Sequence, residues 1–564
     1  MPQSSTSTSR HQYPLKQEWP AELVQKYREA GYWRGETMTG FLRHNASEFA
    51  ERIAIAGFSG DQWQRWTYAQ LWNKVETAAA GFLALGLQPG DRVVVQIGNM
   101  PEFYSTVFGL FRAGLIPVYA LPAHRHTEIV HFARKAEASA YVTMQQYEQF
   151  DYRALAREVQ AQCPALEHVV IIGEAQEFHA FHGFKAQPGL LPTQDADPQA
   201  VAFLQISGGS TGLSKLIPRT HDDYIYSFRA SNEICNITER SVYMVALPAA
   251  HNFPMSSPGA FGALYAGAAV VLSPNPSPEA AFPLIAQEQV TAVGLVPPLA
   301  LLWAQAAQSS AYALTSLQVV QVGGAKLTPE AARRVIGGLQ CQLQQVFGMA
   351  EGLVNYTRLN DSEETIIGTQ GRPISPGDEI LVVDDHGHPL DSGKTGYLLT
   401  RGPYTLRAYH NDDAANARSF TEDGFYRTGD VVLRTAEGYL IVQGRATDHI
   451  NRAGEKISAE EIEDHLLAHP QVFDATVVSV PDEFLGERSC AFIIAKAGEQ
   501  PRAIELKQWF KTRGVAAFKI PDQIVFVDSF GTTAVGKTSR KELRATLRQN
   551  LLDAEKNAKD SHRQ

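Results

Sequence analysis

Short, uninterrupted runs rich in valine and isoleucine recur along the chain and constrain its fold more than any other feature. They lie at residues 92–97, 168–172, 268–272, 317–322, 475–480 and 490–495. Because apolar residues follow one another without alternation, each run predicts a strand buried on both faces. Helical patterns lie between several of them, as at residues 68–85 and 329–339. The alternation predicts an α/β protein with a large N-terminal domain of mostly parallel sheets flanked by helices.

The pattern changes after about residue 401. Short strands are expected at 421–427 and 438–443, separated by Asp-Gly and Glu-Gly turns. Ser458 and Glu461 then form a capping box that begins a helix, and Pro470 ends it. The short segment after Arg445 contains no proline, which favours a hinge over a long tether. The predicted divisions are a disordered leader at 1–17, a large domain at 18–445, a small mobile α+β domain at 446–552 and a polar tail at 553–564.

Composition excludes several classes of protein. With 564 residues, 44% hydrophobic and 20% charged, the chain has the composition of an ordinary soluble globular protein. Its four cysteines lie far apart with no CxxC pair, which argues against a disulfide scaffold and a zinc site. No apolar run is long enough to span a membrane, and the N-terminus lacks the apolar core of a secretory signal. A cytoplasmic protein without a membrane span is therefore expected.

The charge is unevenly spread. The net charge is −10, which argues against a general nucleic-acid binder, whereas residues 501–564 carry a net charge of +6. The basic segment at 501–564 is therefore expected to bind an anion. The alternative is a basic helix at 540–548 that faces solvent.

A loop rich in glycine and hydroxyl residues, SGGSTGLSK at 207–215, follows an apolar run. Small residues let the backbone approach an anion, and consecutive N–H groups form a nest around it. A flexible surface loop is the alternative, but the preceding strand and the terminal lysine favour a phosphate loop. Its candidate ligands are Ser207, Gly208, Gly209, Ser210, Thr211, Gly212 and Lys215.

A second glycine-rich pattern, GTTAVGKT at 531–538, matches the P-loop consensus. Only 26 residues follow Thr538, which is enough for one helix. A P-loop fold needs further strands after that helix, including one with a Mg²⁺-binding aspartate. A P-loop NTPase is therefore disfavoured, although Lys537 remains a candidate.

Two further segments carry weaker signals. In QVFGMAEG at 345–352, Phe347 is placed to flank a base and Glu351 to hold Mg²⁺, unless this is a helix N-terminus with a solvated glutamate. In YRTGD at 426–430 followed by Gly444-Arg445, the acid Asp430 is suited to accept two ribose hydroxyls, unless it is an aspartate in a turn.

Taken in order, these segments resemble the adenylate-forming superfamily of acyl-CoA synthetases, luciferases and nonribosomal-peptide adenylation domains. The resemblance covers about residues 14–552 and includes a hinge motif at 444–457 and the C-terminal VGKTSRK. The stretches at 120–125, 251–259 and 352–358 further resemble the stand-alone aryl-acid ligases of siderophore biosynthesis, those for 2,3-dihydroxybenzoate above all.

The resemblance implies roles for individual residues. Lys537 is implied as catalytic, bridging the acid's carboxylate and the α-phosphate of ATP. Glu351 and Thr211 are implied to hold Mg²⁺. ATP would further contact Gly323, Gly324, Ala325, Val346, Phe347, Gly348, Met349, Asp430 and Arg445. The aryl acid would contact His251, Asn252, Ser257, Gly324 and Val354. The hinge and the approach of the thiol would involve Thr447, Arg452, Gly454 and Lys456.

The implied reaction forms an aryl adenylate and then transfers the aryl group to the phosphopantetheine thiol of an aryl carrier protein. Asn252 suits a benzoate, which has no ammonium to pair with a buried carboxylate. Ser257 matches a polar residue near the 3-hydroxyl, and Val354 a smaller residue that leaves space, both typical of 2,3-dihydroxybenzoate enzymes. A salicylate–AMP ligase, an aryl acid–CoA ligase and a nucleotide-binding regulatory protein remain alternatives. Thr447 and Ala453 depart from the family's hinge and NRGGEK patterns.

Overall fold

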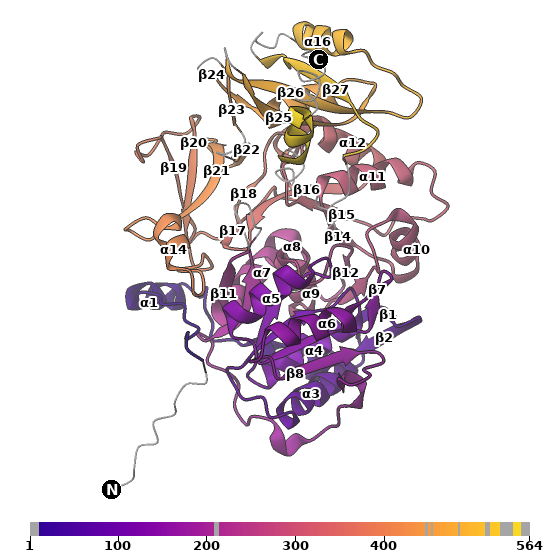
Figure 1. Cartoon of the computed structure of the whole chain (residues 1–564), viewed down its shortest axis with the longest axis vertical. Coiled ribbons are helices and arrows are strands. Elements are labelled where there is room, and N and C mark those ends of the chain that lie inside the picture. Colours follow the sequence, from indigo (N-terminus) through magenta and orange to yellow (C-terminus); the bar gives the residue numbers. More distant parts are fainter. Residues whose placement is uncertain are drawn as a thin grey trace, which may run out of the picture.

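Two mainly parallel sheets form the centre of the large N-terminal domain (Figure 1). The computed structural model describes residues 11–207, 214–445, 449–452, 455–482, 485–513, 519–530 and 545–553. Within these residues one sheet has nine strands, in the order β18-β17-β16-β15-β14-β12-β13-β1-β2, and the other has seven, in the order β11-β10-β4-β3-β5-β8-β9. The predicted α/β class is confirmed.

The strands of the nine-stranded sheet are β1 (Ile53–Ser59), β2 (Gln62–Thr67), β12 (Val242–Val245), β13 (Ala269–Leu272), β14 (Ala292–Leu295), β15 (Val319–Gly323), β16 (Gln342–Met349), β17 (Gly352–Tyr356) and β18 (Arg372–Pro373). Those of the seven-stranded sheet are β3 (Arg92–Gln96), β4 (Ile116–Tyr119), β5 (Ala140–Met144), β8 (His168–Ile172), β9 (His179–Ala180), β10 (Val201–Ile206) and β11 (Leu216–Thr220). A small hairpin joins β6 (Gln146–Tyr147) and β7 (Phe150–Asp151). Antiparallel pairing is confined to sheet edges, at β1–β2, β16–β17, β17–β18 and β10–β11.

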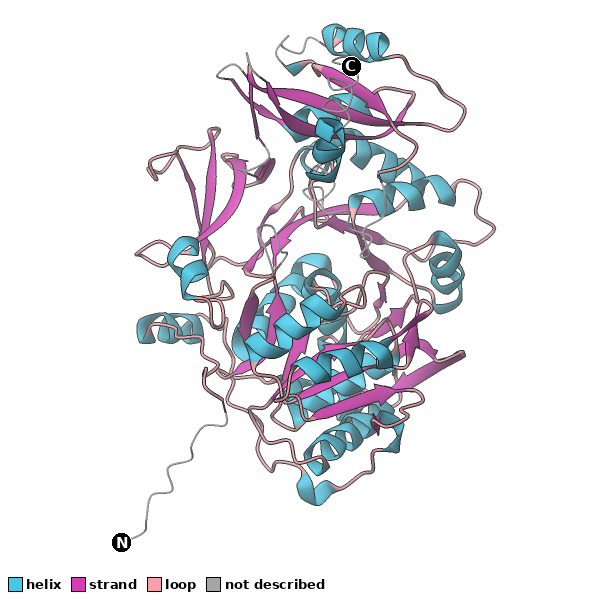
Figure 2. Cartoon of the chain, viewed as in Figure 1, coloured by secondary structure: helices cyan, strands magenta, loops and turns pink. Residues whose placement is uncertain are grey.

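Helices cover the faces of these sheets (Figure 2). Helix α4 (Pro101–Arg112) is buried along almost its whole length and contacts β1 of one sheet and β4 of the other, so it lies between the two sheets. Apolar residues lie on all sides of this helix, which fits a helix buried all round, although Glu102, Ser105 and Thr106 are buried as well. The remaining helices of the large domain are α1 (Ala21–Glu29), α2 (Met38–Glu48), α3 (Tyr68–Ala84), α5 (His126–Ala136), α6 (Tyr152–Gln162), α7 (His221–Cys235), α8 (Asn252–Ser256), α9 (Gly259–Tyr265), α10 (Pro278–Glu288), α11 (Pro297–Ala307), α12 (Pro329–Leu339), α13 (Glu363–Gly368) and α14 (Asp413–Ser419).

An antiparallel sheet of β19 (Glu379–Val383), β20 (Thr395–Arg401), β21 (Tyr426–Arg434) and β22 (Leu440–Arg445) completes the large domain. The prediction of a strand at 421–427 is wrong over most of its length. Residues 421–425 form a tight turn, in which the N–H of Gly424 donates to the carbonyl of Thr421 at 3.0 Å. Gly424 has φ +82°, which suits glycine and ends the strand pattern there.

The small C-terminal domain is built on a five-stranded sheet within the described residues. Its elements are β23 (His449–Arg452), β24 (Glu455–Ser458), α15 (Ala459–Leu467), β25 (Val472–Asp482), β26 (Gly486–Ala495), α16 (Ala503–Thr512) and β27 (Gln523–Phe526). The Ser458 hydroxyl caps α15 by accepting from the N–H of Glu461, as predicted. A helical segment at 545–553 covers another part of the sheet, where Leu547 packs with Val478 and Phe492.

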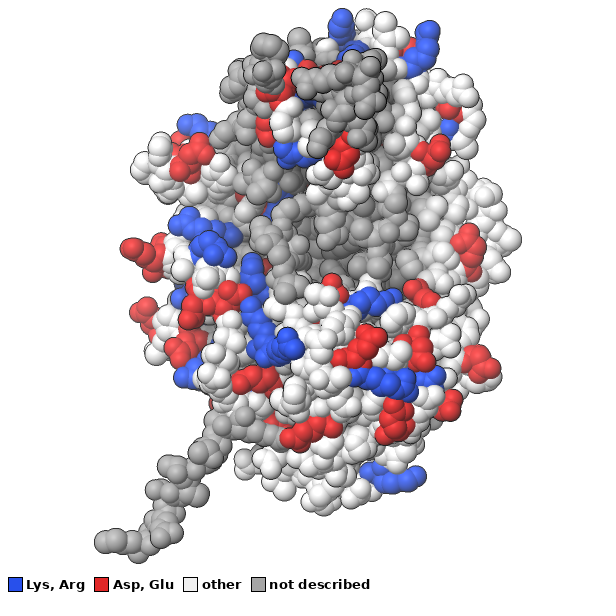
Figure 3. Space-filling model, viewed as in Figure 1, with Lys and Arg blue, Asp and Glu red and all other residues white. Residues whose placement is uncertain are grey.

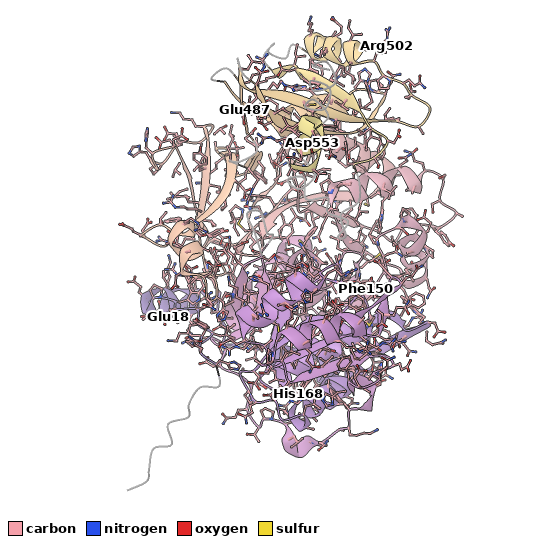
Figure 4. The ribbon with its side chains drawn as sticks, viewed as in Figure 1. Glu18, Phe150, His168, Glu487, Arg502 and Asp553 are labelled. Carbon is pink, nitrogen blue, oxygen red and sulfur yellow. The ribbon has the colours of Figure 1, made fainter. Side chains whose placement is uncertain are left out.

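The small domain contacts the large domain through α15. The Arg334 guanidinium on α12 donates to the carbonyl of Leu467 at 2.6 Å, and the Ser458 hydroxyl donates to the carbonyl of Gln443 at 2.9 Å. Figure 4 shows Arg502 and His168 at opposite ends of the molecule, in the small and large domains. Among the described residues, these two hydrogen bonds join the two ends of α15 to α12 and β22.

Residues 11–17 correct part of the predicted disordered leader. The backbone N–H groups of Gln12 and Tyr13 donate to the Glu137 carboxylate, each at 2.9 Å. The side chain of Gln17 forms hydrogen bonds with the backbone of Arg407 and Ala408. This stretch is ordered because its polar groups are satisfied by the body of the large domain.

No helix among the described residues is both long and apolar enough to cross a membrane. On the face shown in Figure 3, lysine and arginine side chains are interspersed with aspartate and glutamate.

Candidate active site

The ends of the predicted phosphate loop are tied together at the mouth of the β10–β11 hairpin. The N–H of Ser207 donates to the carbonyl of Lys215 at 3.0 Å, and the N–H of Lys215 donates to the Ser207 hydroxyl at 2.9 Å. Gly208, Gly209, Ser210, Thr211 and Gly212 lie outside the described residues. Ser207 is thus a structural anchor of the loop, and Lys215 directly precedes β11.

Tyr409 joins two predicted site residues that are 136 positions apart in the sequence. The Lys215 ammonium lies 4.5 Å from the centre of the Tyr409 ring, and the Tyr409 hydroxyl donates to Oε1 of Glu351 at 2.9 Å. Burial and the neighbouring Glu351 charge raise the pKa of Tyr409, so it remains a hydroxyl donor. The sequence carried no signal for Tyr409, because it stands in an irregular segment outside every quoted motif.

Glu351 lies in the turn of the β16–β17 hairpin, not at a helix N-terminus, and it is only 9% exposed. The alternative of a solvated glutamate is therefore wrong. The next residue, Gly352, has φ +150°, and a Cβ there would meet the Cα of Thr405 at 2.6 Å. The turn is accordingly held against the 404–406 segment, where the N–H of Leu406 donates to the carbonyl of Glu351 at 2.7 Å.

Asp430 and Arg445 face each other across the antiparallel strands β21 and β22. Their Oδ1 and Nη1 atoms are 2.9 Å apart. Burial raises the pKa of Asp430, and the Arg445 charge opposes this shift. The alternative of an aspartate in a turn is wrong, since Asp430 is a buried strand residue. Its carboxylate is therefore held at a fixed position next to the hinge segment.

The candidate adenine residues lie together where β15 and β16 end. Gly323 pairs with Val346 in the sheet, and a Cβ on Gly323 would meet the Val346 carbonyl oxygen at 2.7 Å. Gly324 and Ala325 are exposed just beyond, as is Gly348 on the neighbouring strand, while Phe347 and Met349 are half-buried. Exposed backbone between two strand ends provides room for a flat ligand.

The candidate acid-site residues come from α8 and β17. His251 caps α8, where its Nδ1 accepts from the N–H of Phe253, and the Phe253 ring lies 3.3 Å from the position of a Cβ on Gly323. Ser257 and Val354 are both buried. Burial raises the pKa of Tyr356 on β17, so its hydroxyl stays protonated.

Asn252, the first residue of α8, is half-buried. Its Oδ1 accepts a hydrogen bond of 2.9 Å from the hydroxyl of Tyr224 on α7. Tyr224 belongs to no motif singled out in the sequence. The sequence of α7 mixes polar and apolar residues and gives no sign of this contact.

Arg219 is another residue that the sequence analysis did not single out. Its guanidinium forms a buried ion pair with Asp223 at 2.9 Å and donates to the carbonyls of Ala350 at 2.7 Å and Tyr404 at 3.1 Å. It therefore connects the strand after the phosphate loop to the residue before Glu351. An arginine inside an otherwise apolar strand was the available signal.

The predicted hinge and thiol-approach residues are described only in part. Arg452 pairs with Asp522 inside the small domain, with Nη2 and Oδ1 2.8 Å apart. Thr447, Gly454 and Lys537 lie outside the described residues, and only the backbone of Lys456 is described. In this structure the Arg452 side chain thus supports the small domain's own sheet.

No group of three or more His, Cys, Asp or Glu side chains within the described ranges is arranged to hold a metal ion. An open hollow of about 600 Å³ lies along α5, lined by His126, His131, Arg134 and Lys135 among others. It includes none of the predicted site residues.

The buried Asp378 supports the acid site through Tyr404. The Tyr404 hydroxyl donates to Oδ2 of Asp378 at 2.6 Å and accepts from the N–H of Val354 at 3.2 Å. Oδ1 of Asp378 is buried with no hydrogen-bond partner among the described residues. Burial raises the pKa of Asp378 from 3.8 to about 7, and the hydrogen bonds from Tyr404 and Ser375 lower it in part.

This shift predicts a pH-dependent stability. Between about pH 4 and pH 7 the folded protein holds a proton on Asp378 that the unfolded chain has lost. Raising the pH through this window should therefore destabilise the protein relative to Asp378→Asn, by up to about 4 kcal/mol. Urea unfolding of both proteins at several values from pH 4 to 8 measures the difference. Parallel pH profiles would contradict the assignment.

Two family models match the chain. The model described as AMP-binding enzyme matches residues 42–410, and the one described as AMP-binding enzyme C-terminal domain matches residues 461–537. The chain therefore belongs to the AMP-binding enzyme family, whose members use ATP. The second match includes most of the GTTAVGKT pattern, so the P-loop NTPase interpretation is rejected.

Individual relatives agree with the family. The chain is 56% identical to the 2,3-dihydroxybenzoate-AMP ligase of Bacillus subtilis, over 95% of this chain and 98% of the relative. It is 50% identical to the vibriobactin-specific 2,3-dihydroxybenzoate-AMP ligase of Vibrio cholerae, over 93% and 96%. The solved apo structure of Mycobacterium smegmatis MbtA is 48% identical, with a TM-score of 0.73 and coverage of 94% and 98%. The resemblance inferred from the motifs is confirmed.

Proposed function

We propose that this enzyme activates 2,3-dihydroxybenzoate with ATP and then transfers the aryl group to the phosphopantetheine thiol of an aryl carrier protein in catechol siderophore synthesis. The observation that carries the proposal is the 56% identity, over 95% of the chain, to a 2,3-dihydroxybenzoate-AMP ligase. Asn252 supports it, since a neutral amide beside a benzoate leaves no buried carboxylate unpaired. Ser257 offers a hydroxyl to the 3-hydroxyl group, and Val354 leaves space for it.

In the first step a carboxylate oxygen of the acid attacks the α-phosphorus of ATP. The bond between the α- and β-phosphates breaks, and pyrophosphate leaves. Carboxylate and triphosphate repel each other, so the enzyme must position both and compensate their charge. We assign this task to Lys537, with Lys215 and the 207–212 loop on the departing phosphates.

The nucleoside is assigned to the segments that converge near the hinge. The adenine ring would lie between 323–325 and 346–349, where two strand ends leave exposed backbone. The ribose hydroxyls would bind Asp430, whose carboxylate is fixed by Arg445. His251 and Gly324 would border the acid.

The residues present fit a bound Mg²⁺. Glu351 supplies a carboxylate, the hard oxygen ligand that Mg²⁺ prefers, and Tyr409 orients it through Oε1. One carboxylate and the phosphate oxygens form the usual set for this ion, with Thr211 as a further candidate ligand. When bound, the ion would neutralise charge on the phosphates. Tyr409 itself contributes by holding Glu351 through the hydrogen bond to Oε1.

The second step needs a different orientation of the small domain. Rotation at Thr447 would remove Lys537 and bring the 452–456 segment to the site. The thiol sulfur would then attack the carbonyl carbon of the adenylate, AMP would leave, and the thiol proton would pass to solvent. Such a rotation would have to break the interdomain hydrogen bonds that Ser458 and Arg334 donate.

Salicylate is the second candidate substrate. The chain is 45% identical, over 93% of its length, to the salicyl-AMP ligase of Mycobacterium tuberculosis. A site built for 2,3-dihydroxybenzoate gains about 1–3 kcal/mol from the additional hydroxyl. Salicylate is therefore expected to be a slower substrate rather than a rejected one.

ATP–pyrophosphate exchange with 2,3-dihydroxybenzoate, salicylate and benzoate tests the proposal. We expect kcat/KM to fall by about 5- to 150-fold for each hydroxyl removed, because each leaves a polar partner unpaired. Equal rates with benzoate and 2,3-dihydroxybenzoate would contradict the substrate assignment. Thioester formation on a phosphopantetheinylated aryl carrier protein, compared with free coenzyme A, then separates a carrier-protein ligase from an aryl acid–CoA ligase.

A further inference from the structure

The Asn252 amide accepts a hydrogen bond from a tyrosine, Tyr224, whose ring is buried and packed between other side chains. Tyr224 is 1% exposed, and its ring packs edge-on against Phe203 with centroids 4.6 Å apart. The Arg219 guanidinium lies over the same ring at 4.9 Å. The 2.9 Å hydrogen bond from the Tyr224 hydroxyl to Oδ1 of Asn252 therefore has a fixed origin.

The hydroxyl proton of Tyr224 points toward Asn252. Burial raises the pKa of Tyr224, which keeps the proton on the hydroxyl. The neighbouring Ser256 hydroxyl donates to the carbonyl of Asn252 at 3.3 Å, and the Gln205 amide donates to the carbonyl of Ala250 at 3.4 Å. The Tyr224 hydroxyl carries a single proton, and it donates this proton to Oδ1 of Asn252. Oδ1 of Asn252 therefore accepts a hydrogen bond from within the protein. The Nδ2 amino group is the part of the amide that can donate a hydrogen bond to a ligand.

We propose that Tyr224 is a positioning residue which fixes the Asn252 amide with its N–H donors toward the ortho substituent of the aryl acid, and so selects an ortho-hydroxyl over an ortho-amino group. The proposal rests on the proposed function, in which Asn252 borders the acid. An ortho-hydroxyl donates its proton to the neighbouring carboxylate and leaves its oxygen as an acceptor for Nδ2. An ortho-amino group uses one N–H in the same way but points its second N–H at Nδ2, so that two donors face each other.

Tyr224→Phe tests this selection. Without the tyrosine hydroxyl the amide is free to turn Oδ1 toward the ligand. The ratio of kcat/KM for anthranilate to that for 2,3-dihydroxybenzoate, measured by ATP–pyrophosphate exchange, should rise by about tenfold or more. Tyr226→Phe is the matched control. It lies on the same helix and loses a buried hydrogen bond to Ser375 of 2.6 Å, but it does not touch Asn252. Its ratio should stay at that of the unmodified enzyme.

A second variant keeps the inference testable should Tyr224→Phe fail to fold. In Asn252→Asp the side chain can only accept, so the same ratio should rise with Tyr224 present. A ratio unchanged in Tyr224→Phe, with exchange activity toward 2,3-dihydroxybenzoate retained, would overturn the inference, as would an unchanged ratio in Asn252→Asp. If none of the aryl acids supports ATP–pyrophosphate exchange by the unmodified protein, the proposed function itself fails and the inference with it.

Discussion

Replacing Lys537 with alanine is expected to lower the rate of adenylate formation by about 10²- to 10³-fold. In the proposed mechanism its ammonium neutralises two anions, the carboxylate and the α-phosphate, at the moment they approach. No other lysine of the small domain is assigned to this role. ATP–pyrophosphate exchange with 2,3-dihydroxybenzoate measures the loss.

Two controls separate this effect from a general defect. Lys511→Ala removes a positive charge from an exposed position at the end of α16 and should leave exchange unchanged. The Lys537→Ala protein, given preformed aryl adenylate, should still load the carrier protein, because the second step does not use Lys537. Normal exchange in Lys537→Ala would remove the central element of the mechanism.

Arg219→Met is expected to produce the largest loss of stability, about 3–5 kcal/mol in the free energy of unfolding. The change leaves the Asp223 carboxylate buried without its partner, with both side chains 2% exposed in the pair. It also releases the carbonyls of Ala350 and Tyr404, which Arg219 holds. Urea unfolding monitored by tryptophan fluorescence measures the difference.

Arg157→Met is the matched comparison. Arg157 also pairs with a carboxylate, Glu177, at 2.6 Å, but both side chains are about half exposed. Exposed pairs contribute about 0–1 kcal/mol, so this change should have little effect. If the two substitutions cost the same, the burial of the Arg219–Asp223 pair is not what stabilises this region.

Much of the secondary structure was predictable because its signals are local. The run at 168–172 became β8 and the pattern at 329–339 became α12, both with the predicted bounds. The strand expected at 421–427 failed because a tight turn at Gly424 interrupts it. Glycine in an otherwise strand-like stretch indicates such a turn, but the neighbouring Phe425 and Tyr426 favoured the strand.

The candidate site likewise contains residues that local sequence signals indicate and residues that they do not. The sequence singles out Ser207, Lys215, Glu351 and Asp430 because each stands in a short motif whose chemistry can be inferred from its residue types. It does not single out Tyr409, which contacts Lys215 and Glu351, or Tyr224, which donates to Asn252. A tyrosine hydroxyl reaches a partner far away in sequence, and nothing in its own neighbourhood shows which partner that is.

The sequence by itself determined the α/β class, the order of the chemical motifs and the family to which the chain belongs. These follow from periodicity and from residues close together in the chain. Only the tertiary structure decided that Tyr409 contacts both Lys215 and Glu351 and that the Tyr224 hydroxyl donates to Oδ1 of Asn252. The physical reason is that a hydrogen bond depends on distance and direction between two atoms, and both are set when distant segments pack together.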